Sequence, residues 1–590
     1  MKHLISSLLL TLIATPAAAA QDLVQLLRPS GGGEYELMAC GLLDGLPAPG
    51  YPIATGLTPL AAELNGLSAL DELGAAAGKT ESLPGGGNIL RLPGDAGSLI
   101  LMRRDGASTR FSWWHIQADG TPKLLLEQTG TGPLGTTNPF LPRAAVTPNT
   151  SHAMFATTLA AGGNLEVASL LTNLPPLDRT ANLPPLDLRG ESLLLGRDFG
   201  IATHAGGALV VPHAFPGQAT AVQFANGTPA HISGSTVFSP RGTRAALIAG
   251  PTSTDGHPWV VTEAGVASCA NDTPMVMAGA GHFPEAVNGP WLAVSDDGTR
   301  CAWRATEGIK TECYSVRLDV VSPQVEHLTS DANYLDTLDQ IGVIGFLKPN
   351  SILMGVGETL PGGGFDRVDL FEVSFEANGT TTQRNLTASS GQALPPFTLP
   401  PQIESMQIMR SAVSDRVLIY DDHGSNGRFL VVQAGVSGPV IAMDNVRELD
   451  WVRRVGDELW FSAERDFGSS RPRHIFRTDG GFTTAPTILV AGGENLLFES
   501  PVVGSGWIAF RRELEIGPVT LERAFAGGTH QVIIPSSIPI LDGPVLLPAN
   551  HLGVIALNAN GPRGIVIRPD ASRGWLLRTP VPAGTFLLGN

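Results

Sequence analysis

Long apolar runs are scarce in this sequence. Only the first twenty residues hold one, where Lys2 and His3 precede the apolar stretch 4–13 and the small residues 17–20. That order is typical of a secretory signal, so we expect 1–20 to be removed and the mature chain to start near Gln21. An uncleaved anchor is the alternative, but about ten apolar residues are roughly half of a bilayer crossing. No later run reaches the length of a span, so we expect no membrane span after cleavage.

Charge is also sparse, and positive charge especially so. Charged residues make up 16% of the chain, with 38 basic against 54 acidic side chains and a formal net charge of -16. A negative field of that size repels polyanions and anionic lipid. The sequence therefore predicts no nucleic-acid partner.

Local catalytic signatures are missing. The sequence has no G-x-S-x-G turn of a serine hydrolase and no H-E-x-x-H zinc motif among its 13 histidines. Distant histidines could still converge on a central channel, and the candidates in turns are His204, His213, His257, His423 and His474. Each is more often a surface or turn histidine than a ligand, so we assign no catalytic residue and no cofactor-binding residue.

Glycine and proline are abundant, at 70 and 46 residues, beside 43% hydrophobic residues. Such a chain can bury a large core between many tight turns. A polar turn leading into a short apolar strand recurs, most clearly in "FSPRGTRAALIAG" from Phe238 and "VSDDGTRCAWRAT" from Val294. About ten such anchors occur at spacings of about 41 to 66 residues, close to the period of propeller blades.

The spacing predicts an all-β fold, a β-propeller of about eight four-stranded blades with a range of seven to ten, over 88–590. One such sheet is apolar on both faces, and radial stacking hides both. A solenoid would have shorter units, and a row of Ig-like sandwiches would need blocks near 100 residues. In the N-terminal segment 21–87 we expect one amphipathic helix near 59–78, capped by Thr58 with Pro59 at its first position.

The stretch from Ser295 to Thr329, with "SDDGTR", "CYSVRLD" and "HLTSD", resembles the TolB-like or WD40-like (PD40-type) propeller repeat of exported bacterial proteins. A second copy ends in "DLFEVSFEANGTTTQRNLTASSG", and 457–480 is similar to another secreted bacterial repeat. The clear resemblance covers about 237–480. It implies a propeller whose loops carry recognition.

Four cysteines remain in an oxidising compartment, and three pairings are possible. Cys301 and Cys313 flank a segment that is expected to fold as a hairpin, which favours a Cys301–Cys313 disulfide and leaves Cys40 to reach Cys269. Four buried thiols are the alternative.

Two acidic loops place oxygen donors at alternate positions, as calcium prefers. The candidate ligands in "DDHGSNG" are Asp421, Asp422 and Asn426; the second loop is 331–339. The first loop is more simply a tight hairpin. Trp113 and Trp114 could offer a platform for a sugar, but successive strand residues face opposite sides, so at most one shares a given face.

Two functions follow. The first is a non-enzymatic binding or protein-interaction scaffold, periplasmic or secreted, that holds a protein or carbohydrate ligand at a propeller face. The alternative is a polysaccharide lyase or hydrolase whose residues converge on the central channel, which paired carboxylates or clustered histidines at a channel mouth would reveal.

Overall fold

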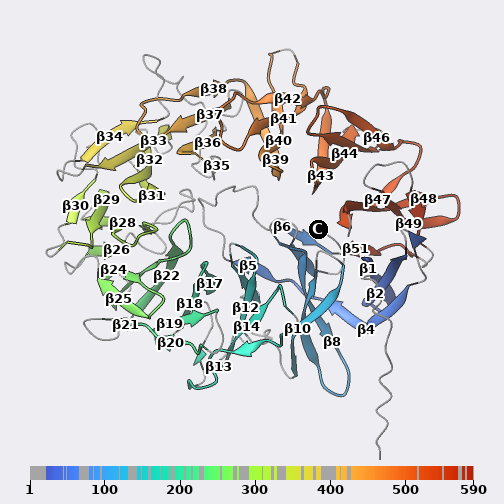
Figure 1. The fold of residues 1–590 in the computed structure, drawn as a ribbon, viewed down its shortest axis with the longest axis horizontal. Helices are drawn as coiled ribbons and strands as arrows, with labels where there is room; N and C mark the ends of the chain where they lie inside the picture. The colour runs from blue at the N-terminus through green and yellow to red at the C-terminus, as the bar shows by residue number, and fades with distance from the viewer. Residues whose placement is uncertain are drawn as a thin grey trace, which may run out of the picture.

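The structure is a computed structural model that describes residues 22–588 except for internal stretches, the longest of which are 66–78, 130–141, 278–291, 329–339 and 387–406. Every described element is a β-strand, and the described residues contain no α-helix. Figure 1 shows that the sheets follow one another around a ring in chain order. The predicted all-β class is confirmed.

Six sheets have four strands each and run as antiparallel meanders. Their strands are β17 (Leu193–Leu195), β18 (Phe199–His204), β19 (Gly207–Pro212), β20 (Thr220–Ala221); β31 (Gln340–Lys348), β32 (Ser351–Thr359), β33 (Phe365–Phe375), β34 (Thr381–Asn385); β35 (Gln407–Arg410), β36 (Arg416–Asp421), β37 (Arg428–Gln433), β38 (Ile441–Met443); β39 (Val446–Val455), β40 (Glu458–Arg465), β41 (Arg473–Asp479), β42 (Thr487–Val490); β43 (Leu496–Gly504), β44 (Trp507–Leu514), β45 (Val519–Phe525), β46 (His530–Ile534); β47 (Ile540–Leu547), β48 (His551–Asn558), β49 (Gly561–Ile567) and β50 (Gly574–Leu576).

Two ten-stranded sheets each join successive units of the same kind. The first contains β1 (Asp22–Gly31), β2 (Glu34–Leu43), β3 (Leu46–Pro47), β4 (Tyr51–Pro59), β6 (Lys79–Ser82), β7 (Asn88–Arg91), β8 (Ser98–Arg104), β9 (Arg110–Ile116), β10 (Pro122–Thr129) and β51 (Phe586–Leu588). The second contains β21 (Gln223–Phe224), β22 (His231–Phe238), β23 (Ala245–Thr252), β24 (Asp255–Val261), β25 (Val266–Cys269), β26 (Met275–Met277), β27 (Leu292–Val294), β28 (Arg300–Glu307), β29 (Lys310–Arg317) and β30 (Val325–His327).

A five-stranded and a two-stranded sheet complete the set. Their strands are β5 (Glu63–Asn65), β11 (Arg143–Val146), β12 (His152–Ala156), β14 (Leu165–Ser169), β15 (Leu177–Asp178), and then β13 (Ala161–Gly163) and β16 (Leu186–Asp187). The predicted count of eight units is not confirmed, because the larger sheets hold further units beside the six separate ones.

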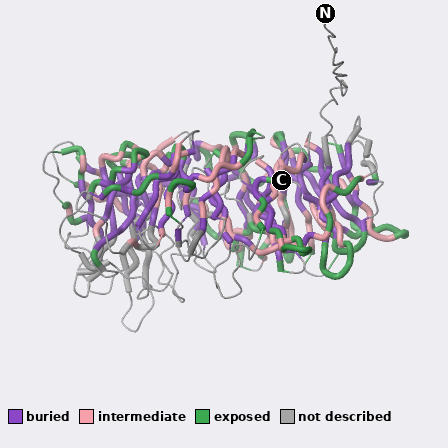
Figure 2. The backbone as a smooth tube through the Cα atoms, turned by 90° about the horizontal axis from the view of Figure 1, so that it is seen from below, coloured by how far each residue is buried: buried purple, intermediate pink, exposed green. Residues whose placement is uncertain are grey.

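Each four-stranded sheet buries both of its faces, as the composition requires. Phe461 and Trp460 are neighbours on β40 and are both fully buried, yet they join different cores. Phe461 packs with Phe429 of the preceding sheet, and Trp460 packs with Phe510 of the following one. In Figure 2 the buried residues lie in the middle of the ring's thickness. Because apolar burial is the main favourable term in folding, these shared cores hold the ring together.

The recurrent polar turns link neighbouring units of the ring. The amide of Arg197 donates to the carbonyl of Gly242 at 2.9 Å, and the amide of Arg241 donates to Asp296 Oδ1 at 2.6 Å. Thr243 Oγ1 donates to the Asp296 carbonyl at 2.8 Å. The turn motif found in the sequence therefore contributes bonds between neighbouring units, both across two sheets and within one ten-stranded sheet.

The predicted helix near 59–78 is wrong where the structure describes that segment. Thr58 and Pro59 end β4, where Thr58 pairs with Arg103 of β8, and Glu63 begins β5. Pairing with β8 overrides the local helical pattern, because the strand's backbone groups find partners in the sheet. Residues 66–78 lie outside the described residues, as do 1–21 with the expected signal peptide. The described residues also contain no helix long and apolar enough to cross a membrane.

Candidate functional site

A pocket opens where the first and last parts of the chain meet. The strand β51 pairs antiparallel with β1, so residues near 587 complete the sheet that begins at residue 22. Beneath the pocket, both segments share one apolar core with the sheet of β47 to β50. The pocket has a volume of about 530 Å³, within the range of ligand sites. It is lined by Arg28, Pro29, Ser30, Glu36, Asn560, Pro562, Arg563, Val581 and Pro582.

One wall of the pocket carries an ion pair. Arg28 on β1 lies directly across from Glu36 on β2, and its Nη2 and Nε donate to Glu36 Oε2 at 2.5 Å and 3.2 Å. The two side chains are 25% and 22% exposed. A cross-strand pair of this kind is held in place by the register of the sheet.

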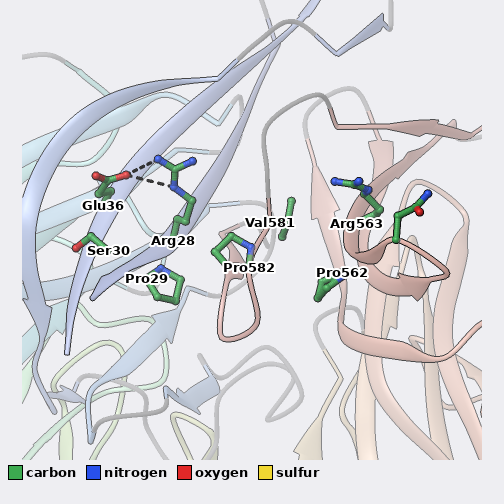
Figure 3. A pocket seen from close by; sticks show the side chains of 9 residues that line it. Arg28, Pro29, Ser30, Glu36, Pro562, Arg563, Val581 and Pro582 are labelled. Atoms are coloured by element: carbon green, nitrogen blue, oxygen red, sulfur yellow. Dashed lines mark hydrogen bonds and ion pairs between the residues drawn. The ribbon is translucent and has the colours of Figure 1, made fainter. Parts of the chain in front are cut away.

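The opposite wall comes from the turn between β48 and β49. Gly561, with a φ of 101°, allows this tight turn, and Arg563 follows it on β49. Arg563 has no ion-pair or hydrogen-bond partner among the described residues. Figure 3 shows the Arg28–Glu36 pair on one side, Arg563 on the other, and Val581 and Pro582 between them.

The floor of the pocket is fixed by a short turn. Thr585 Oγ1 donates to the carbonyl of Pro582 at 2.7 Å, and Val581 is 3% exposed. A Cβ on Gly584 would lie 3.4 Å from Pro29 Cγ, which places this turn against β1. Three of the lining residues are prolines, whose rings fix the backbone φ.

The predicted disulfide between Cys301 and Cys313 is wrong. Cys301 lies opposite Val316 and Cys313 lies opposite Arg304, so the two cysteines are offset in register. Cys301 packs in the core on one face of the sheet and Cys313 in the core on the other. Cys40 lies in the core of the first sheet and Cys269 on β25 of another. The described residues contain no disulfide.

The calcium candidates are only partly described. Asp421 ends β36 and pairs with Arg428, whereas Asp422 and Asn426 lie outside the described residues, as does the loop 331–339. In the part of the chain that the structure describes, no group of three or more potential metal-binding side chains is found.

The candidate histidines are dispersed over several sheets. His204 ends β18, His257 lies on β24, and His423 is outside the described residues. Burial lowers the pKa of His213 to about 4, where His152 stacks on it at 5.4 Å between ring centroids. The ring of His474 accepts the amide of Gly492 through Nδ1 at 3.1 Å.

The tryptophan pair behaves as expected. Trp113 is 3% exposed and packs against Phe155 in one core, while Trp114 packs against a different core on the other face. The prediction that at most one of them shares a given face is confirmed.

A carboxylate pair lies on β14 and β15. Glu166 stands directly opposite Asp178, and burial, followed by the charge of Asp178, raises the pKa of Glu166 to about 7. In the order of strands across this sheet, β15 and β14 lie at the opposite end from β5. The pair therefore does not mark the channel mouth that the enzyme hypothesis requires.

A second charged cluster surrounds Arg473, which is 5% exposed. Its guanidinium reaches Glu448 at 2.6 Å, Asp450 at 2.9 Å and Glu464 at 3.4 Å. Burial outweighs the attraction of Arg473 and raises the pKa of Asp450 to about 6. The cluster ties β39, β40 and β41 together at one end of their sheet.

No sequence pattern marks the pocket residues. Arg28 and Arg563 lie near opposite ends of the sequence, in no recurrent motif. The pairing of β51 with β1 and the core shared with the sheet of β47 to β50 bring their segments together. The acidic loops were predicted as calcium sites because their oxygen donors lie close together in the sequence.

No family model and no curated protein matches this chain. Among solved structures, it is similar to prolyl endopeptidases at 14% identity and a TM-score of 0.29, over 63% of this chain and 53% of that one, so it spans about half of their length. It is similar to TolB from Agrobacterium tumefaciens at 11% identity and a TM-score of 0.23, over 52% of this chain and 83% of that one.

A third similar structure is the β-propeller domain of the Trilobed protease from Pyrococcus furiosus, at 7% identity and a TM-score of 0.28, over 75% of this chain and 95% of that one. Likeness at this level carries no argument about activity. The class of protein follows from its own strand order and ring: it is an all-β protein with propeller-type structural neighbours.

Proposed function

We propose that this chain is an exported, closed β-propeller that acts as a non-enzymatic binding or protein-interaction scaffold, in the cell envelope or outside the cell. The observation that carries the proposal is the pocket between β1, β2 and β49, where charged side chains stand on rigid strands around an open space. Binding to such a site costs little ordering of the protein. The ligand is a protein or a carbohydrate.

The ring form supports this role in a second way. The innermost strands β39, β43, β47 and β51 contact one another in succession, and β51 then pairs with β1. A frame joined in this manner holds its loops at fixed separations, so recognition can use several sheets at once. Export is supported by the leader-like order of residues 1–20.

The test uses the mature chain from Gln21 as bait against an extract of the native envelope. We expect a partner that mass spectrometry identifies and that binds again as a purified component. The bait with Leu587→Asp, which places a charge in the core at the junction, serves as the opened-ring control and should lose the partner.

Enzymatic assays on the same preparation provide the opposing outcome. Turnover of a polysaccharide by the pure protein, abolished by one point substitution, would contradict the scaffold and favour the lyase or hydrolase. If neither a partner nor turnover is found, the scaffold proposal is refuted, because a specific partner is what it predicts.

A further inference from the structure

The charges that line the pocket do not balance. Arg28 is compensated by Glu36, with which it shares two hydrogen bonds to one carboxylate oxygen. Arg563, on the opposite wall, has no ionic partner among the described residues. The lining therefore holds two guanidinium groups against one carboxylate, a local excess of one positive charge in a chain whose formal net charge is -16.

We propose that the pocket binds a ligand through a single carboxylate, with Arg563 as its ion-pair partner. This proposal rests on the binding function proposed above and names the ligand chemistry of the same site. A planar guanidinium matches a planar carboxylate with two parallel hydrogen bonds.

The remaining lining favours a singly charged group. Glu36 stays in the pocket and repels a second negative charge on the ligand, and the negative field of the whole chain opposes polyanions. A phosphate dianion is therefore a poorer match than a carboxylate. Asn560 and Ser30 can add neutral hydrogen bonds, and both are exposed.

The apolar part of the lining indicates what accompanies the carboxylate. Pro29, Pro562 and Pro582 present aliphatic surface in the pocket, and Figure 3 shows Pro582 between the two arginines. A carboxylate next to a small aliphatic or sugar body fits such a surface. Two sources share this chemistry, the C-terminus of a peptide and a uronic acid residue.

The experiment titrates the full mature chain with four probes in calorimetry: a short peptide ending in Ala-Val with a free carboxylate, its C-terminal amide, glucuronate and glucose. We expect at least one acid to bind, and its neutral counterpart to bind about tenfold or more weakly. Whichever acid binds identifies the source. Higher salt should weaken the binding.

Arg563→Gln should reduce the affinity for the acid about tenfold or more, and Arg563→Lys, which keeps the charge without the planar fork, should have an intermediate effect. Arg110→Gln is the matched control, because Arg110 lies on β9 and is 51% exposed. Thermal unfolding of each variant checks that the fold is retained.

The inference is overturned if neither acid binds, if acid and neutral probes bind equally, or if Arg563→Gln behaves like Arg110→Gln. Its failure is separable from failure of the scaffold. If the envelope partner is captured but neither acid binds in a way that depends on Arg563, the scaffold stands and the carboxylate site does not.

Discussion

In a recurrent turn, one residue can have to meet both a backbone and a packing requirement. Gly242 has a φ of 70°, a conformation that costs a residue with a Cβ, and it also touches the neighbouring sheet. A Cβ at Gly242 would lie 2.4 Å from the backbone nitrogen of Arg197. The glycine of the S-P-x-G turn is therefore needed for sheet packing as well as for the turn itself.

Gly242→Ala should lower the free energy of unfolding by clearly more than Gly456→Ala. Gly456 has a similar φ of 61° but no atom within 4 Å of an added Cβ, so its substitution adds only the backbone cost of about 1 to 2 kcal/mol. Urea denaturation of both variants measures the difference. Equal losses would show that the contact with Arg197 adds nothing.

Asp450 makes stability depend on pH. Its pKa is raised from 3.8 to about 6, so protonation favours the folded state. The stabilisation is complete below pH 3.8 and is lost as the pH rises through about 6, in total about 3 kcal/mol. We expect wild type to lose stability relative to Asp450→Asn between pH 4 and pH 8, measured by denaturant unfolding.

A constant difference between wild type and Asp450→Asn over this pH range would contradict the raised pKa of Asp450.

At the scale of the element, the pleat of each strand decides which core a side chain enters. Cys301 and Trp303 share one face of β28, while Ala302 faces the other core. The hairpin of β28 and β29 was predicted from its sequence, and the structure contains it. The register was not predictable, because a shift of one residue moves every side chain to the opposite face.

This register predicts that Cys301 and Cys313 are not linked to each other in the folded protein. Peptide mapping of the unreduced chain by mass spectrometry should show no peptide in which Cys301 is linked to Cys313. Recovery of a linked peptide from protein that was never unfolded would contradict the register.

In the segment near Thr58, sheet pairing overrides a local helix pattern. Its leucine spacing and its Pro59 are typical of a helix start, but Thr58 pairs with Arg103 in the sheet. Local propensity is weak compared with the backbone bonds that a neighbouring strand offers. The partner strand lies more than 40 residues away, so the local sequence around Thr58 does not indicate the pairing.

At the scale of the whole molecule, the junction of β51 with β1 holds the two ends of the ring. Leu587 is 1% exposed in a core with Val24, Leu26 and Val566. Its backbone amide donates to Asp542 Oδ2 at 3.2 Å. The junction shapes the candidate site as well, because the pocket is lined from both sides of it.

Leu587→Ala should therefore destabilise the protein by about 2 to 5 kcal/mol, the usual cost of truncating a buried leucine. Leu576→Ala is the matched control, since Leu576 lies on the edge strand β50 and is 54% exposed. Thermal unfolding compares the two. Similar losses would show that the junction adds little to the stability of the ring.

The sequence by itself determined the all-β class and the recurrence of turn and strand, because these depend on local chemistry: glycine at positive φ, alternating apolar residues and polar turns. The tertiary structure alone decided how units join into larger sheets, which faces Cys301 and Cys313 occupy, and the pocket between Arg28 and Arg563. Those features depend on which strands pair across long stretches of chain, and such pairing is set by the total burial that the ring achieves.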